Sequence, residues 1–198
     1  MPTPTLQEQL KQRNAEFAAL APADKRVTIA RDVIAALDAQ RLTARCNAYG
    51  RFLIKNYSEM SFDESEAVYA SDAQTVLAEG KLECSACALG SLFVCAVERM
   101  NAINVLALQS TPATGMHRYL ADVFSSEQLD LIEAAFEGQA YARSERFRYC
   151  DREEDSVLLQ AAVSFVCESK ARDFDFDADD CMRRIMSNII ANQGEFIP

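Results

Sequence analysis

The longest run of apolar and small residues extends from Cys84 to Met100 and reads CSACALGSLFVCAVERM. It contains no proline, and its first charged residue is Glu98, so it is long for a strand and short for a membrane span. Its apolar and small residues fall on every side of a helix, which is typical of a helix surrounded by other helices. Gly90, near the middle, predicts that a neighbouring backbone comes close. We therefore expect a buried central helix over 84–100.

Amphipathic patterns with a helical period predict further helices on both sides of this segment. Residues suited to an N-cap or a first turn precede several of them, such as Thr3 or Thr5, Pro22 and Ser71, and Ser125 with Gln128 is typical of a capping box. The expected helices cover about 5–20, 22–40, 63–69, 72–79, 116–123, 126–138, 156–171 and 177–192. The stretch 42–54 alternates imperfectly and contains Asn47 and Gly50, which favours a short β-hairpin. The predicted fold is mainly α, a compact multi-helix domain around the 84–100 helix with a small β-hairpin near 42–54.

Composition agrees with one folded unit. The chain has 198 residues, of which 49% are hydrophobic and 25% are charged, and it has only 6 Gly and 5 Pro. This length suits a single helical domain over 1–198, and few turn-forming residues favour helices over a large sheet. No signal-peptide pattern and no apolar run of about 18 residues is present. We therefore expect a cytoplasmic protein without membrane contact.

The net charge of −10 is unevenly distributed. Residues 1–55 carry nine Lys or Arg against five Asp or Glu, whereas 56–198 carry eleven against twenty-five. An acidic body argues against direct binding of nucleic acid, because phosphate contacts need a concentrated basic surface. The basic residues that could still form a local patch are Lys25, Arg26, Arg31, Arg41, Arg45 and Arg51, although such residues are more often solvated helix faces.

Seven cysteines lie mostly within helical patterns, and we expect most of them to pack as small buried side chains. Cys84-x-x-Cys87 has the spacing of a metal or redox pair, but a structural zinc site needs four ligands and no second pair accompanies it. A redox pair would stand at a helix N-terminus after a strand, and no strand is expected before Cys84. The sequence thus predicts no metal site and no cofactor, with Cys84 and Cys87 as the remaining candidates for a metal.

The segment Asp173-Phe-Asp-Phe-Asp177 resembles the first ligands of a calcium loop. The pattern then fails, because Ala178 stands where the loop needs Gly and Arg184 where it needs Glu. Acidic residues at a helix N-terminus need no metal to explain them.

No catalytic motif is present in the sequence. His117 is the only histidine, so mechanisms with two imidazoles are excluded. No nucleophile elbow, phosphate-binding loop, dinucleotide glycine run or zinc-protease motif occurs, and no carboxylate pair stands out by its spacing. An enzyme is therefore less expected than a binding protein.

Three stretches together resemble an uncharacterised group of bacterial and phage-borne proteins. They are KRVTIARDVIAAL at 25–37, CSACALGSLF at 84–93 and FSSEQLDLIEAAFE at 124–137, and the shared core-helix pattern is C-x-x-C-A-L-G-[SA]-L-F. The resemblance implies a single compact helical unit in a bacterial or infected bacterial cytosol. It transfers no catalytic residue, because no activity is established for that group.

We therefore expect an acidic binding or regulatory protein that acts through protein–protein contacts, with a basic partner. One form is a phage or mobile-element inhibitor that presents carboxylates where phosphates would lie on a host nucleic-acid-binding factor. The candidate binding residues are Arg146, Arg148, Glu153, Glu154, Asp155, Asp173, Asp175 and Asp177. The alternative is an enzyme or small-ligand binder with a pocket assembled from sequence-distant residues such as Tyr49, His117, Arg118 and Arg148.

Overall fold

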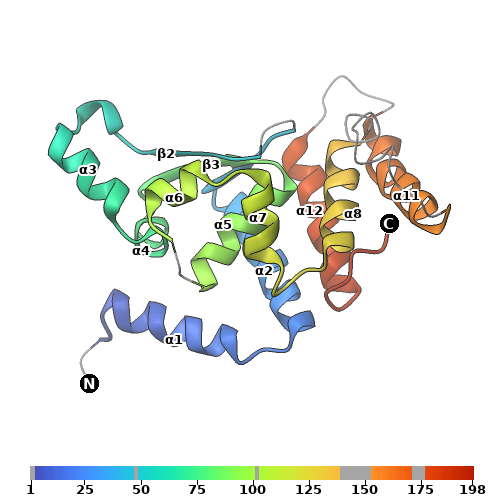
Figure 1. Cartoon of the computed structure of the whole chain (residues 1–198), viewed down its shortest axis with the longest axis horizontal. Helices are drawn as coiled ribbons and strands as arrows, with labels where there is room; N and C mark the ends of the chain where they lie inside the picture. Colours follow the sequence, from blue (N-terminus) through green and yellow to red (C-terminus); the bar gives the residue numbers. More distant parts are fainter. Residues whose placement is uncertain (1–2, 47–48, 101–102, 139–152, 171–176) are drawn as a thin grey trace.

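The fold is mainly helical with one small sheet, as the sequence predicted (Figure 1). The computed structural model describes residues 3–46, 49–100, 103–138, 153–170 and 177–198, with backbone only at 153–156 and 166–170. The described helices are α1 (Leu6–Ala18), α2 (Pro22–Asp38), α3 (Phe62–Ala70), α4 (Ala73–Ala78), α5 (Ala88–Met100), α6 (Val105–Ser110), α7 (Ala113–Leu120), α8 (Ser126–Glu137), α11 (Glu153–Lys170) and α12 (Ala178–Ala191), with a 3₁₀ turn, η1, over Tyr57–Glu59. The strands are β1 (Leu42–Ala44), β2 (Arg51–Ile54) and β3 (Leu82–Ala86).

The sheet has the strand order β1, β3, β2. The central strand β3 is parallel to β1 and antiparallel to β2, so that Cys84 lies opposite Leu42 on one side and Phe52 on the other. The expected hairpin is therefore wrong in its pairing, although both of its halves are strands. A local pattern shows that a segment favours a strand, but it cannot show that the partner strand comes later in the chain.

Helix α5 lies at the centre of the fold, and every residue from Ala88 to Val97 is buried. Helices α1, α2, α4, α7 and α8 all pack against it. The expected start at Cys84 is wrong, because Cys84 to Ala86 belong to β3. A half-buried strand of small residues that leads directly into a buried helix gives one apolar run, in which periodicity shows no boundary.

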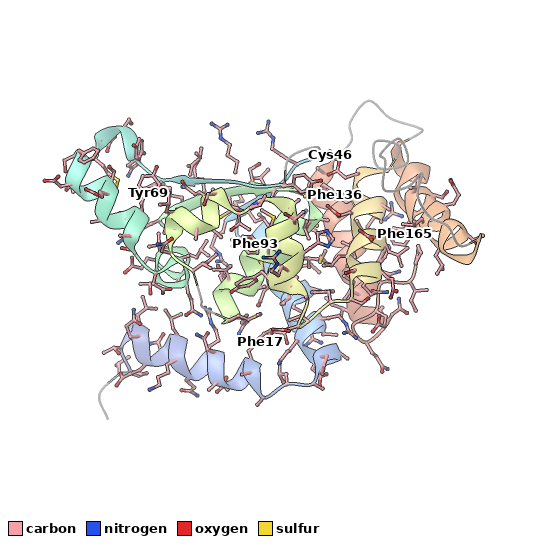
Figure 2. The ribbon with its side chains drawn as sticks, in the orientation of Figure 1. Phe17, Cys46, Tyr69, Phe93, Phe136 and Phe165 are labelled. Carbon is pink, nitrogen blue, oxygen red and sulfur yellow. The ribbon has the colours of Figure 1, made fainter. Side chains whose placement is uncertain are left out.

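Gly90 of α5 has the close backbone neighbour that the sequence predicted. A Cβ atom built at Gly90 would lie 1.6 Å from the carbonyl oxygen of Tyr49, in the chain segment between β1 and β2. On another side of α5, the ring of Phe93 meets Tyr119 of α7 edge to face, with centroids 5.2 Å apart. Figure 2 shows Phe93 near the middle of the molecule.

Local side-chain chemistry sets several helix starts. Thr5 accepts from the backbone amide of Glu8, whose carboxylate accepts from the amide of Thr5, so α1 begins with a full capping box. Ser61 and Glu64 repeat this arrangement at α3. Pro22 stands in the first turn of α2, where its missing N–H costs nothing.

Two of the expected caps differ in detail. Ser125 accepts from the amide of Gln128, but the Gln128 side chain bonds the backbone of Phe196 instead of returning to Ser125. Asp72, rather than Ser71, caps α4 through the amide of Thr75. At α8, a tertiary contact with Phe196 takes the side chain that would complete the capping box. At α4, Ser and Asp are about equally good caps, so the residue types do not decide between the two positions.

The inner face of the sheet and the buried faces of the helices enclose the hydrophobic core. Helix α12 packs against α2, so this C-terminal helix lies against the N-terminal half, and both α12 and α11 pack against α8 (Figure 1). Within the described ranges, no helix has both the length and the apolar character needed to cross a bilayer.

Candidate functional site

The outer face of the three-stranded sheet is the most distinctive surface of the described structure. Alternate strand residues point to opposite faces of a sheet, and the alternation of exposure here is regular. Leu42, Phe52 and Cys84 are buried on the helix side. Figure 1 shows the helices α2 and α5 on that one side of the strands. The outward residues of the strands and their flanking positions are Thr43, Arg45, Arg51, Leu53, Lys55, Glu83 and Ser85.

This face forms an open hollow of about 420 Å³, which we call the sheet-face hollow. It is lined by Gln40, Arg41, Thr43, Arg45, Arg51, Leu53, Lys55, Leu82, Glu83, Cys84 and Ser85. Four of these residues are cationic and one is anionic, in a chain whose net charge is −10. Such a concentration of one sign attracts an oppositely charged partner more strongly than the same charges spread over the surface.

The cations of the hollow are held by different means. Arg41 donates to Glu98 at 3.0 Å, and 42% of its side chain stays exposed. Arg45 and Lys55 continue the strand pairing through their backbone amides, which donate to Ala86 and Lys81. Their side chains, like that of Arg51, are exposed. The strand pairing thus fixes where Arg45, Arg51 and Lys55 leave the surface, and their side chains are exposed to a partner, whereas Arg41 is paired with Glu98.

Ser85 lies on the central strand between Thr43 and Arg51 in the pairing register. Within the described part of the chain, its hydroxyl oxygen is buried and makes no hydrogen bond. A buried polar group without a partner is unusual and costs about 1–3 kcal/mol. Ser85 is one of the residues that line the hollow.

The cysteine pair is placed differently from the sequence expectation. Cys84 is in β3 and Cys87 directly precedes α5, so the strand that was not expected does precede the helix. Both residues are buried, and burial raises the pKa of each thiol to about 12. A low-pKa redox thiol needs the opposite environment, so this pair lacks the electrostatics of a disulfide oxidoreductase.

Four of the eight candidate binding residues lie outside the described residues, and three more have a described backbone only. Arg146, Arg148, Asp173 and Asp175 fall in 139–152 and 171–176, and Glu153, Glu154 and Asp155 are described as backbone only, at the start of α11. Asp177 is the N-cap of α12 and accepts from the amides of Asp179 and Asp180. Its role in the described structure is therefore local.

The alternative from the sequence, a pocket assembled from residues such as Tyr49, His117, Arg118 and Arg148, stays a prediction. Tyr49 lies beside Gly90, Arg118 is exposed on α7, and His117 contacts Glu133 of α8 at 3.2 Å. None of these three lines the sheet-face hollow. Arg148 lies outside the described residues.

Three of the four cations of the hollow belong to the basic patch that the sequence suggested. Of the six basic residues proposed as a patch, Arg41, Arg45 and Arg51 meet there, whereas Arg26 is used inside the fold, where it donates to Val123 and Gly194. Lys55 and Ser85 were missed. The alternation Arg51, Leu53, Lys55 was the available signal for Lys55, but the position of Ser85 depends on a strand pairing that no local pattern shows.

No protein-family model, curated protein or solved structure matches this chain.

Proposed function

We propose that this chain is a binding protein that acts through protein–protein contacts, and that its contact surface is the sheet-face hollow. The observation that carries the proposal is the set of four cations around the unpartnered Ser85 hydroxyl. Carboxylates are the protein groups that pair with such cations, so the expected partner presents an acidic segment.

An acidic protein segment suits this surface better than nucleic acid. The outward residues of the three strands include no aromatic ring on which a base could stack. Glu83 stands in the middle of the face, and the remainder of the chain is strongly acidic, so a long polyanion would be repelled beyond the hollow. A short carboxylate-bearing segment meets the cations without following the acidic surface.

The test is binding of a fluorescein-labelled oligoglutamate peptide, followed by anisotropy in low salt. Replacing Arg51 and Lys55 by Gln removes two exposed charges, each worth about 0.2–1 kcal/mol in an ion pair, so affinity should fall about tenfold. The matched control replaces Lys11 and Arg31 by Gln. These are two exposed cations on α1 and α2, so the same change in net charge should leave the affinity nearly unchanged.

Three outcomes would contradict the proposal. One is an equal loss in both double variants, which would show that only net charge matters. Another is tighter binding of an unstructured oligonucleotide than of the peptide. The third is binding that does not weaken as salt rises, because exposed charges are screened over about 10 Å at 0.1 M salt.

The acidic-face hypothesis from the sequence stays a prediction. Under that hypothesis the protein is an inhibitor of phage or mobile-element origin. Its carboxylates would occupy the phosphate-binding positions of a basic host factor in the cytosol. Affinity capture from bacterial lysate at low and raised salt distinguishes the acidic-partner proposal from the basic-partner hypothesis. The Arg51 and Lys55 double variant loses an acidic partner, whereas it retains a basic partner that binds elsewhere.

A further inference from the structure

Glu133 of α8 is buried in an unusual setting. Its neighbours on the helix, Leu131, Ile132, Ala134 and Ala135, are all buried apolar residues. Glu133 is only 4% exposed, and among the described residues no other Asp, Glu, Lys or Arg is as deeply buried. Because a buried charge costs several kcal/mol unless it is paired, Glu133 needs polar partners at this position, and His117 is one of them.

Two further potential ligands meet Glu133. His117, which points from α7, places its Nε2 atom 3.2 Å from the Glu133 carboxylate, and Asp130 lies one helical turn before Glu133 on the same face of α8. One ligand atom from each of the three residues can be chosen so that all lie within 4.8 Å of one another. The three side chains thus come together from two different helices, α7 and α8.

We propose that His117, Asp130 and Glu133 form a binding site for a divalent transition-metal ion of the zinc class. Two ligands that are each about 2.1 Å from one ion stand at most about 4.2 Å apart, so a small rotation of one carboxylate closes the site. All three residues also make other contacts in the chain, which a bound ion would join or replace. The proposal does not depend on the function of the sheet-face hollow.

The donor set decides the class of metal. An imidazole nitrogen with carboxylate oxygens suits Zn²⁺ and its first-row neighbours, whereas Ca²⁺ and Mg²⁺ prefer oxygen ligands throughout. Three protein ligands also leave a coordination position for water. Because the ligands come from α7 and α8, the ion would hold these two helices together and stabilise the fold.

The experiment is calorimetric titration of Zn²⁺ into the full chain after removal of metal by a chelator, with the melting temperature measured in parallel. We expect one ion per chain and a higher melting temperature with Zn²⁺. His117→Gln and Asp130→Asn should each weaken binding at least about tenfold, because each removes a ligand. Asp130 is only partly buried, so its variant tests the site even if changes at Glu133 prevent folding.

The matched controls are Glu127→Gln, in the first turn of the same helix, and Asp122→Asn, both at exposed positions. These should bind Zn²⁺ as the unchanged chain does. Substituting Co²⁺ gives a further readout, since an N/O site lacks the strong thiolate charge-transfer absorption of a cysteine site. The proposal is overturned if no ion binds, if His117→Gln and Asp130→Asn bind as tightly as the controls, or if the Co²⁺ spectrum shows thiolate ligation.

Discussion

At Gly90 a single missing side chain allows two backbones to touch. A Cβ atom there would overlap the carbonyl oxygen of Tyr49, an atom that cannot rotate away as a flexible side chain can. We predict that Gly90→Ala lowers the free energy of unfolding by about 3 kcal/mol, the upper part of the range for overpacking. Urea denaturation measures this change.

Gly80 provides the control for this prediction. It has a φ of +67°, and a Cβ atom there would meet nothing within 4 Å. Gly80→Ala should therefore cost only the strain of a left-handed backbone, about 1–2 kcal/mol. An equal or smaller effect at Gly90 than at Gly80 would show that the contact with Tyr49 is looser than described.

The buried cysteines should be chemically inert. Burial raises the pKa of Cys84 and Cys87 from 9.0 to about 12, which lowers the thiolate fraction at neutral pH about a thousandfold. Burial also raises the pKa of Cys95 well above its ordinary value. In the folded chain these three residues should react with iodoacetamide far more slowly than the partly exposed Cys46.

Mass spectrometry of the alkylated peptides gives the rate at each cysteine separately. Unfolding in urea is the control, because it should make the four rates similar. Rapid alkylation of Cys84 or Cys87 in the native chain would contradict this prediction and would support a redox or metal-binding role for the pair.

The role of a residue was predictable from the sequence only where its residue type and its place in one element were enough to indicate that role. Gly90 was identified correctly, because a glycine in a helix needs a reason of its own. Ser85 and Glu133 could not be identified in this way. Both are ordinary polar residues until the fold buries them, and their neighbours come from other elements.

At the scale of the element, the start of α3 depends on a capping box. We predict that Ser61→Ala destabilises the chain by about 1 kcal/mol at neutral pH. Hydrogen bonds from the backbone and side chain of Ser61 lower the pKa of Glu64 below its ordinary value of 4.5. The contribution of Glu64 is therefore present above pH 4.5 and is lost as the pH falls through its lowered pKa.

The corresponding measurement compares Glu64→Gln with the unchanged chain by urea denaturation at pH 7 and at pH 3. The difference should shrink at pH 3. Glu66→Gln, an exposed change in the same helix, is the control and should show little difference at either pH. If Glu64→Gln changed the stability equally at both pH values, the ionised Glu64 carboxylate would not be what stabilises the capping box.

Both edges of the sheet are covered by side chains from helices. Asp179 of α12 accepts from the outward amide of Ala44 at 2.6 Å, and Gln109 of α6 donates to the outward carbonyl of Phe52. Unpaired strand edges otherwise pair with other chains, so these contacts protect the fold from edge-to-edge association.

We predict that Asp179→Ala speeds hydrogen exchange at the Ala44 amide and costs about 1.5–3 kcal/mol, the range for a hydrogen bond to a charged group. Asp180→Ala is the matched control, because Asp180 also lies in the first turn of α12 and should contribute only to the helix dipole. Unchanged exchange at Ala44 in the Asp179 variant would mean that the contact does not protect this edge.

Most helices were predictable as elements because they have apolar stripes of their own, and the starts near Thr5 and at Pro22 were found with them. The short helix α6 was not expected as a helix. Strand β3 was missed. Its five residues lead almost directly into α5, and a strand has few residues with which to show its period.

At the scale of the whole molecule, the fold collects charge that is scattered along the sequence. The excess of basic residues in 1–55 predicted a local patch, but it could not show which residues share a face. The pairing of β1 and β2 on either side of β3 brings Arg45 and Arg51 to the same side of the sheet, whereas Arg26 turns toward the C-terminal segment. The sheet therefore determines the candidate site.

The strand order also constrains how the chain can fold during synthesis. The central strand β3 leaves the ribosome after both of its neighbours, so β1 and β2 have no partner until Leu82–Ala86 has emerged. Helix α2 likewise remains without the apolar face of α12 until Ala178–Ala191 has emerged. A growing chain thus exposes basic and apolar residues of its N-terminal segment until these later elements have been made.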